Sequence, residues 1–343
     1  MAYKKIIVQK DLDEYIDRSF NHSSFELPRK FSAPISLIWE ITGDCNSNCL
    51  YCSGGFPRAT NELKLEEKIN LAKEISSMKV FMVSISGGEP LIKKDLLEII
   101  PIFLENNVSV MVCTSGFNIN YDILKGLLSM KEVAFNISID SIDEEINDFQ
   151  RGRKGALKEA IQTIDFIRKN ELTHSFISVE SVVTKKNYTC MDDLVLYFSE
   201  NYSVDEIRIQ PMVSMNKKVV DSELDISGEQ FDYCVCKVNE LISHYNNKIL
   251  NDKVESIVCV RFIDQFKLIK NGLKTGRAWG GVISPEGNFS LSVYLPWDLG
   301  NIHQCGNFNN TWNEKFSTGW NIINKYMFDK SIENVYELKK LYI

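Results

Sequence analysis

Short apolar runs alternate along this chain with longer stretches in which apolar residues recur every three or four positions. Six of the short runs are rich in β-branched and aliphatic residues and predict strands, at residues 35–41, 80–85, 108–113, 133–139, 177–184 and 206–210. Helices are predicted between them, at residues 65–78, 91–106, 121–130, 156–169 and 191–199. This alternation is typical of parallel strands joined by crossover helices. Six units are fewer than the eight of a closed barrel, so we expect an α/β fold built as an open, partial (β/α)₆ barrel.

The pattern changes after Pro211 and divides the chain into three parts. We expect an N-terminal extension at residues 1–33, the partial barrel at residues 34–213, and a linker with a small α+β C-terminal module at residues 214–343. Within the last part the pattern predicts a helix at residues 229–247, an apolar run at 254–262, and a β-hairpin whose turn has the sequence SPEGN at residues 284–288.

Composition excludes several classes of protein. A formal net charge of −7, without a long basic patch, disfavours nucleic acid as a partner. No run approaches the roughly 20 apolar residues that span a bilayer, and the N-terminus lacks the apolar core of a signal peptide. We therefore expect a cytoplasmic protein without a membrane partner, whose nine cysteines are free thiols or metal ligands rather than disulfides.

Three cysteines, Cys45, Cys49 and Cys52, directly follow the first predicted strand with CxxxCxxC spacing. Such close spacing lets one loop wrap an iron–sulfur cluster, and three thiolates on a four-iron cluster leave one iron open to bind a substrate. The alternatives are a structural zinc site or three unrelated core thiols. Zinc requires a fourth ligand nearby, and the four histidines are scattered singly along the chain.

Polar motifs stand at the ends of the following predicted strands, where the active residues of a barrel collect. The second strand ends in SGGEP, the third in TSG, and the fourth in SID followed by an Arg-Gly pair. The candidate residues are Gly87, Gly88, Glu89, Pro90, Thr114, Ser138, Asp140 and Arg151, with Gln210 at the end of the sixth strand. Taken singly, GGEP is also compatible with an ordinary turn, and Arg151 with a solvated charge at a helix entry.

Together these motifs resemble the signature of the radical S-adenosylmethionine (SAM) superfamily, with Tyr51 at the aromatic position of the CxxxCx(aromatic)C segment. The resemblance implies one [4Fe-4S] cluster on Cys45, Cys49 and Cys52, whose open iron binds SAM. It also implies reductive cleavage of SAM to a 5′-deoxyadenosyl radical, with an electron donor such as flavodoxin or ferredoxin. By the same resemblance the GGEP loop binds the SAM amino group, and the positions of Ser138 and Arg151 hold its ribose and carboxylate. Tyr51, Thr114, Asp140 and Gln210 complete the expected cofactor contacts.

The tail resembles the SPASM or twitch extension of this superfamily, but Ala278 and Ser292 stand where relatives have cysteines. Neither residue replaces a soft thiolate on iron, so we expect a degenerate module without an auxiliary cluster. The alternative is an unusual site assembled from Cys234, Cys236, Cys259 and Cys305. Cys234 lies on the apolar face of its predicted helix and Cys113 within a strand, so core packing is expected for both.

The resemblance favours hydrogen abstraction from a peptide or peptide-derived natural product. Without an auxiliary cluster to accept an electron, a redox-neutral outcome such as epimerisation or rearrangement gains weight, and Cys236 and Cys259 are candidates for a thiol that returns hydrogen. The alternatives are a small-molecule substrate such as an aminoglycoside or nucleoside, a role in haem or cofactor maturation, and a non-catalytic SAM-binding maturation scaffold. The three cysteines together with GGEP weigh against the scaffold.

Overall fold

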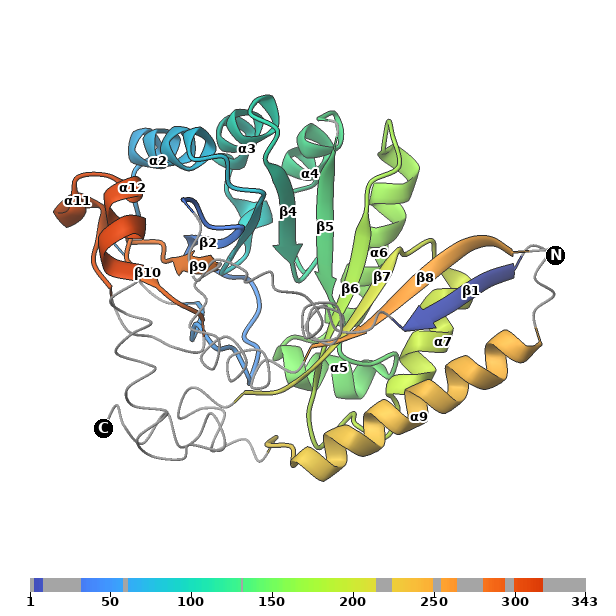
Figure 1. Ribbon diagram of the computed structural model, residues 1–343. Coiled ribbons are helices and arrows are strands. Elements are labelled where there is room, and N and C mark those ends of the chain that lie inside the picture. The colour runs from blue at the N-terminus through green and yellow to red at the C-terminus, as the bar shows by residue number, and fades with distance from the viewer. Residues whose placement is uncertain are drawn as a thin grey trace, which may run out of the picture.

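One curved sheet organises the fold (Figure 1). The computed structural model describes residues 3–8, 32–57, 61–130, 132–213, 224–248, 254–263, 280–293 and 299–316. In these ranges the sheet has ten strands, in the order β1-β8-β7-β6-β5-β4-β3-β2-β9-β10. The strands are β1 (Tyr3–Val8), β2 (Ser36–Thr42), β3 (Met82–Gly87), β4 (Ser109–Thr114), β5 (Val133–Ser138), β6 (Ile177–Val183), β7 (Glu206–Pro211), β8 (Val254–Phe262), β9 (Gly280–Ile283) and β10 (Phe289–Ser290).

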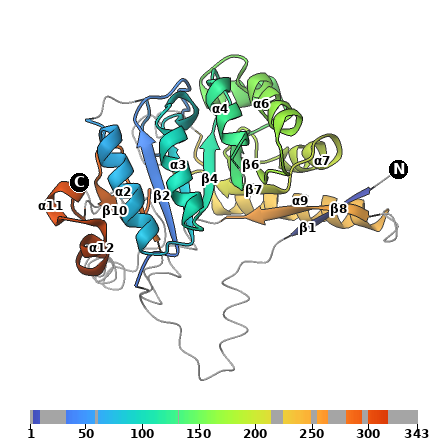
Figure 2. The ribbon, with the colours of Figure 1, turned by 90° about the horizontal axis from the view of Figure 1, so that it is seen from above.

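Helices connect the six central strands and cover the outer face of the sheet (Figure 2). They are α2 (Leu65–Ser77), α3 (Leu96–Glu105), α4 (Tyr121–Leu128), α6 (Ala156–Asn170) and α7 (Met191–Asn201). All neighbouring strands from β2 to β7 are parallel, and no pairing joins the two end strands of the described sheet. The expected open partial barrel of six strand–helix units is therefore confirmed.

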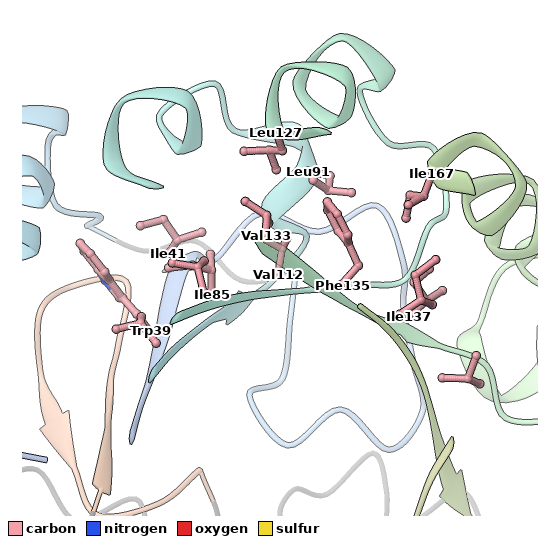
Figure 3. Packing of buried hydrophobic residues seen from close by; sticks show 14 of the residues in the cluster. Trp39, Ile41, Ile85, Leu91, Val112, Leu127, Val133, Phe135, Ile137 and Ile167 are labelled. Atoms are coloured by element: carbon pink, nitrogen blue, oxygen red, sulfur yellow. The ribbon is translucent and has the colours of Figure 1, made fainter. Parts of the chain in front are cut away.

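Alternation along the strands separates an apolar outer face from a polar inner one. Trp39, Ile85, Val112, Phe135 and Ile137 are fully buried. With Leu91, Leu127 and Ile167 they pack between the sheet and its helices (Figure 3). Each such side chain contributes roughly 1.5–3 kcal/mol by leaving water. Because successive strand residues point to opposite faces, the residues next to them face the interior of the barrel.

Helix α5 (Glu144–Arg151) was not predicted from the sequence. Its buried residues are Asn147, Gln150 and Arg151, so it has no apolar stripe for a periodicity analysis to detect. Capping residues instead fix where this helix begins and ends. Asp143 caps the start by accepting hydrogen bonds from the backbone N–H of Glu145 at 2.9 Å and of Ile146 at 3.1 Å, and a left-handed Gly152 ends it.

Segments outside the six units extend the same sheet. Strand β8 pairs with β7, and β1, from the predicted N-terminal extension, pairs with β8. At the other end β9 lies parallel to β2 and forms the predicted hairpin with β10, in which the Ser284 N–H donates to the Asn288 carbonyl at 2.8 Å. Pairing between segments this far apart in the chain leaves no local sequence pattern. The three-part division of the chain stays a prediction.

Helix α9 and four short helices are the remaining described elements. Helix α9 (Gly228–Asn247) contacts α7 and β1, as Figure 1 shows. The short helices η1 (Pro90–Ile92), α11 (Ile302–Cys305), α12 (Phe308–Thr311) and η3 (Trp312–Phe316) complete the described structure. No helix in the described ranges is long and apolar enough to cross a membrane.

Candidate active site

A cavity of about 390 Å³ lies inside the curve of the sheet, at the carboxyl ends of its central strands. The cysteines of the loop after β2 and the glycines after β3 line it, together with polar side chains from β4 to β7. Of the predicted site residues, those that line the cavity are Cys45, Cys49, Tyr51, Cys52, Gly87, Gly88, Thr114, Ser138, Arg151 and Gln210. Glu89, Pro90 and Asp140 are buried behind this lining. The motifs that are scattered in the sequence thus converge on one cavity.

The loop that carries the cysteines is held on one side by the GGEP loop. The Gly88 N–H donates to the Thr42 carbonyl, and the Glu89 N–H donates to the Asp44 carbonyl, both at 2.8 Å. A Cβ atom added to Gly88 would lie 1.9 Å from the Asp44 carbonyl oxygen, so only glycine permits this approach.

The end of α5 holds the same loop from the other side. The Asn48 N–H donates to the Arg151 carbonyl at 3.2 Å, and the Leu50 N–H donates to the Gln150 carbonyl at 2.9 Å. Gly152 has a φ of 64°, and a Cβ there would lie 2.2 Å from the Asn48 carbonyl oxygen. The Arg-Gly pair therefore helps to shape the cysteine loop as well as reaching the cavity.

Arg151 is 6% exposed and forms a two-point ion pair with the fully buried Asp140. The Arg151 Nη2–Asp140 Oδ1 and Nε–Oδ2 distances are 3.0 and 2.9 Å. The Tyr51 hydroxyl donates to Asp140 Oδ2 at 2.5 Å, and the Arg151 guanidinium lies 5.4 Å from the Tyr51 ring centre. Burial opposes the charge of Arg151, but Asp140 raises its pKa above its ordinary value. The alternative that Arg151 is a solvated surface charge is therefore wrong.

Glu89 joins the end of β3 to the end of β4. Its carboxylate accepts from the Thr114 hydroxyl at 2.7 Å, and from the N–H and hydroxyl of Ser115 at 2.9 and 2.7 Å. Burial raises the pKa of Glu89, and the hydrogen bonds from Ser115 and Thr114 lower it in part. GGEP is thus a buried junction between two loops, rather than an isolated surface turn.

The chemistry of the three thiols fits an iron–sulfur cluster. All three line one cavity, and the Phe56 N–H donates to Cys52 Sγ at 3.3 Å. Burial raises the pKa of Cys45 to about 12 and that of Cys49 to about 11, and Arg151 lowers the pKa of Cys49 in part. Iron would deprotonate such thiols on coordination. Among the described residues no three His, Cys, Asp or Glu side chains converge on the single point that a zinc ion requires. A cluster places each thiolate on a different iron, so its ligands need not converge in this way.

The cysteines outside the CxxxCxxC loop lie in different surroundings. Cys234 is fully buried beside Val238, which confirms its predicted core role. Cys113 lines the cavity, so its predicted core role is wrong; the apolar pattern of β4 did not reveal that this position faces the barrel interior. Cys236 is exposed on α9 and Cys259 is half-buried on β8, and neither lines the cavity.

Two positions in the tail bear on the predicted degenerate module. Ser292 lines the cavity, at the position where relatives of the SPASM type are expected to have a cysteine. Ala278 and the side chain of Cys305 lie outside the described residues.

Sequence reasoning missed several polar residues of the barrel interior, four of which have charged or amide side chains. Glu40, Asn136, Glu180 and Arg208 line the cavity from β2, β5, β6 and β7. Glu40, Asn136 and Arg208 each stand between two apolar residues, so a polar residue at an alternate position of an apolar strand was the available signal. Glu180 stands between Val179 and Ser181, so that signal is weaker there.

Comparison with known proteins places this geometry in a family. Residues 39–195 match the Radical SAM superfamily. Mycofactocin maturase MftC of Mycolicibacterium smegmatis is 32% identical over 169 residues, which cover 49% of this chain and 42% of the maturase. The AdoMet-dependent heme synthase of Methanosarcina barkeri is 28% identical over 158 residues, which cover 46% of this chain and 44% of the synthase. The chain thus spans less than half the length of either relative.

Solved structures share the fold. SuiB of Streptococcus suis bound to S-adenosylmethionine superposes with a TM-score of 0.66 at 15% identity, over 84% of this chain and 68% of SuiB. A second SuiB structure, bound to precursor peptide SuiA, superposes with a TM-score of 0.65 at the same identity. The family match covers the cysteine loop, GGEP and the Arg-Gly pair, which the structure brings to one cavity. Residues 39–195 of this chain therefore form a domain of the radical SAM superfamily.

Proposed function

We propose that this protein reductively cleaves SAM and uses the resulting 5′-deoxyadenosyl radical to abstract hydrogen from a peptide or peptide-derived natural product. The observation that carries the proposal is that Cys45, Cys49 and Cys52 face one cavity together with the Gly87-Gly88 loop and the polar strand ends. The peptide class is supported by the likeness to SuiB, which has been solved with a precursor peptide.

The residues of the cavity take distinct roles in this proposal. Cys45, Cys49 and Cys52 hold a [4Fe-4S] cluster, which supplies the electron that breaks a sulfonium bond of SAM. Gly87 and Gly88 offer backbone groups to the SAM amino group. Arg151, locked in orientation by Asp140, presents its remaining donors to the SAM carboxylate. Tyr51, Thr114, Ser138 and Gln210 line the space left for the rest of SAM.

The net reaction belongs to the same proposal. Ser292 in place of a cysteine supports a redox-neutral outcome, such as epimerisation or rearrangement, because no thiolate is available there for an auxiliary cluster. A flavodoxin or ferredoxin is the proposed electron donor, and the reducing cytoplasm suits free thiols and a reduced cluster. The role of Cys236 or Cys259 as hydrogen donor remains a prediction. Replacing both by Ala tests it, because an unchanged reaction product would exclude both cysteines as donors.

A second candidate, haem or cofactor maturation, is favoured by the similarity to the heme synthase of Methanosarcina barkeri. It requires the same cluster and the same cleavage of SAM, so only the substrate separates the two.

Anaerobic reconstitution tests the proposal. We expect about four irons per chain, a reduced electron paramagnetic resonance signal that SAM perturbs, and formation of 5′-deoxyadenosine. Replacing Cys45, Cys49 and Cys52 together by Ala should abolish all three. Cys190→Ser, which alters a thiol outside the cavity lining, should keep the iron. A correctly folded, iron-loaded protein that forms no 5′-deoxyadenosine would contradict the proposal. About eight irons, or a signal that survives the triple change, would contradict a single cluster.

A further inference from the structure

The interior of the cavity carries a group of polar residues that the proposed cluster and SAM contacts do not use. Asn136, Glu180 and Arg208 line it from β5, β6 and β7, and Cys113 lines it from β4. In the parallel register Cys113 lies opposite Asn136, and Glu180 opposite Arg208. We call Asn136, Glu180 and Arg208 the inner polar site.

The Glu180 carboxylate faces the cavity, and Arg208 is near enough to attract it but does not contact it. It accepts a hydrogen bond from Asn136 Nδ2 and another from Gln210 Nε2, the latter at 2.8 Å. Within the described part of the chain no Lys, Arg or His nitrogen lies within 4.0 Å of this carboxylate. The half-buried carboxylate is therefore contacted by two neutral amide donors and attracted by Arg208 only from beyond ion-pair distance.

Arg208 contacts a different carboxylate, that of Glu206. Arg208 Nε lies 2.5 Å from Glu206 Oε2, and Arg261 Nε lies 3.2 Å from the other oxygen of Glu206. The Glu206 carboxylate therefore forms ion pairs with both Arg208 and Arg261. The neighbouring Glu180 stays available to a ligand, although it stands opposite Arg208 in the sheet.

The amide side chain of Asn136 also lines the cavity. It is 2% exposed, and among the described residues its Oδ1 atom is buried without a hydrogen-bond partner. Because Nδ2 of the same amide donates to Glu180, the side chain is fixed with Oδ1 as its remaining acceptor. Buried acceptors in folded proteins are normally paired, so we expect Asn136 Oδ1 to accept a hydrogen bond from a ligand or from water.

We infer that the inner polar site binds a cationic nitrogen group of the substrate, a protonated amine or a guanidinium. Such a group brings a positive charge into direct contact with Glu180, and several N–H donors, one of which pairs with Asn136 Oδ1. A hydroxyl or a neutral amide would satisfy Asn136 but would bring no cation into contact with Glu180. The inference rests on the proposed function, because it takes this cavity to be where the substrate reacts.

The first test compares ligands on the wild-type protein, loaded with cluster and SAM. Isothermal titration measures the affinity of N-acetylarginine amide and of its neutral near-isostere N-acetylcitrulline amide. We expect the arginine derivative to bind about tenfold more tightly or better, as for a hydrogen-bonded charge. Equal affinities would overturn the inference. Agmatine, a guanidinium without peptide groups, separates the two sources of this chemistry: tighter binding of agmatine indicates a small amine, and tighter binding of the arginine derivative a peptide.

The second test removes the charge from the site. Glu180→Gln should abolish the preference for arginine over citrulline, whereas Glu98→Gln, the same change on an exposed part of α3, should keep it. A preference that survives Glu180→Gln would overturn the inference, as would a tenfold loss of SAM affinity in this variant, which would assign Glu180 to SAM. If Glu180→Gln does not fold, Glu180→Asp retracts the carboxylate by one methylene and should weaken arginine binding; unchanged binding would contradict the site.

These measurements do not depend on turnover. Absence of 5′-deoxyadenosine from the wild-type protein would contradict the proposed function, while the arginine preference would still report on the inner polar site.

Discussion

Arg151 and Asp140 form a charged pair in a place where an isolated charge would be strongly disfavoured. Both side chains are almost completely removed from water, and two contacts at about 3 Å fix their relative orientation. A buried pair adds little stability relative to apolar residues, but removing one partner leaves the other charge uncompensated. Arg151 therefore supports the cysteine loop and, in the proposed function, orients a guanidinium toward SAM.

Replacing Arg151 by Ala should destabilise the iron-free protein by about 3–5 kcal/mol, because Asp140 would remain buried without its cation. Urea unfolding under anaerobic conditions measures the change. Lys154→Ala, which removes an exposed charge three residues later, should stay within about 0.5 kcal/mol of wild type. Equal effects of the two substitutions would contradict the buried pair.

Gly88 is limited by the space around its α-carbon. In Gly88→Ala the new methyl group would lie 1.9 Å from the Asp44 carbonyl oxygen, so the loop that carries Cys45 must move. We expect a loss of about 1–3 kcal/mol in stability and a lower iron content after reconstitution. Gly228→Ala is the matched control, because nothing lies within 4 Å of the added atom. Full iron loading of Gly88→Ala would show that the loop tolerates the displacement.

At the scale of elements, the segment just before α2 braces the cysteine loop. Glu62 Oε1 accepts from the Thr42 hydroxyl at 2.6 Å and from the Gly43 N–H at 2.8 Å. Lys93, after η1, contacts Asp44 at 2.6 Å and Glu62 at 3.4 Å. The next residue, Leu63, donates its N–H to the Pro285 carbonyl in the β9–β10 turn at 2.9 Å. The loops after β2 and β3 and the C-terminal hairpin are thus tied together here.

Glu62→Ala should lower stability by about 1.5–3 kcal/mol, since it removes the acceptor of two hydrogen bonds. Glu62→Gln should cost less, because its amide oxygen still accepts from Thr42 and Gly43. Burial opposes the charge of Glu62, but the Thr42 and Gly43 donors and Lys93 hold its pKa below 4.5.

This depressed pKa sets the pH dependence. The charged form of Glu62 stabilises the protein above pH 4.5, and its contribution is lost as the pH falls below that value. The stability difference between wild type and Glu62→Gln should therefore shrink on acidification, as measured by urea unfolding across pH. A stability difference that does not change with pH would contradict the assignment.

On the scale of the whole molecule, the first strand of the chain closes one end of the sheet. Strand β1 pairs with β8 on one side. On its other side Asn246 of α9 accepts from the Ile6 N–H at 3.2 Å and donates to the Ile6 carbonyl at 2.6 Å. A side chain thereby covers backbone groups that an edge strand would otherwise expose.

Neighbouring isoleucines on β1 offer a matched test of this docking. Ile6 is fully buried, whereas Ile7 is 38% exposed. Ile6→Ala should destabilise the protein by about 2–5 kcal/mol, and Ile7→Ala by clearly less, because only the first opens a cavity in the core. Urea unfolding of both variants measures the difference. Similar effects would mean that β1 is not packed as the structure has it.

Much of the fold was determined locally. The alternation of β-branched strands with amphipathic helices predicts the six parallel units, because each element must bury one face and hydrophobic spacing records which face that is. The cysteine spacing and the motifs at successive strand ends are equally local, and the parallel arrangement brings those ends to the same side of the sheet. The converging cavity was therefore predictable from the order of the motifs.

Only the tertiary structure decided which distant residues meet. Helix α5 is held by its caps and by contacts with the cysteine loop, so its polar sequence carries no apolar period. Cys113 faces the cavity, and β1 joins β8 across most of the chain, because strand register and facing depend on partners that a local pattern does not contain. The lack of a contacting cation at Glu180, within the described ranges, has the same origin. The charge of Glu180 is visible in the sequence, but the commitment of Arg208 to Glu206 depends on the side-chain contacts that folding creates.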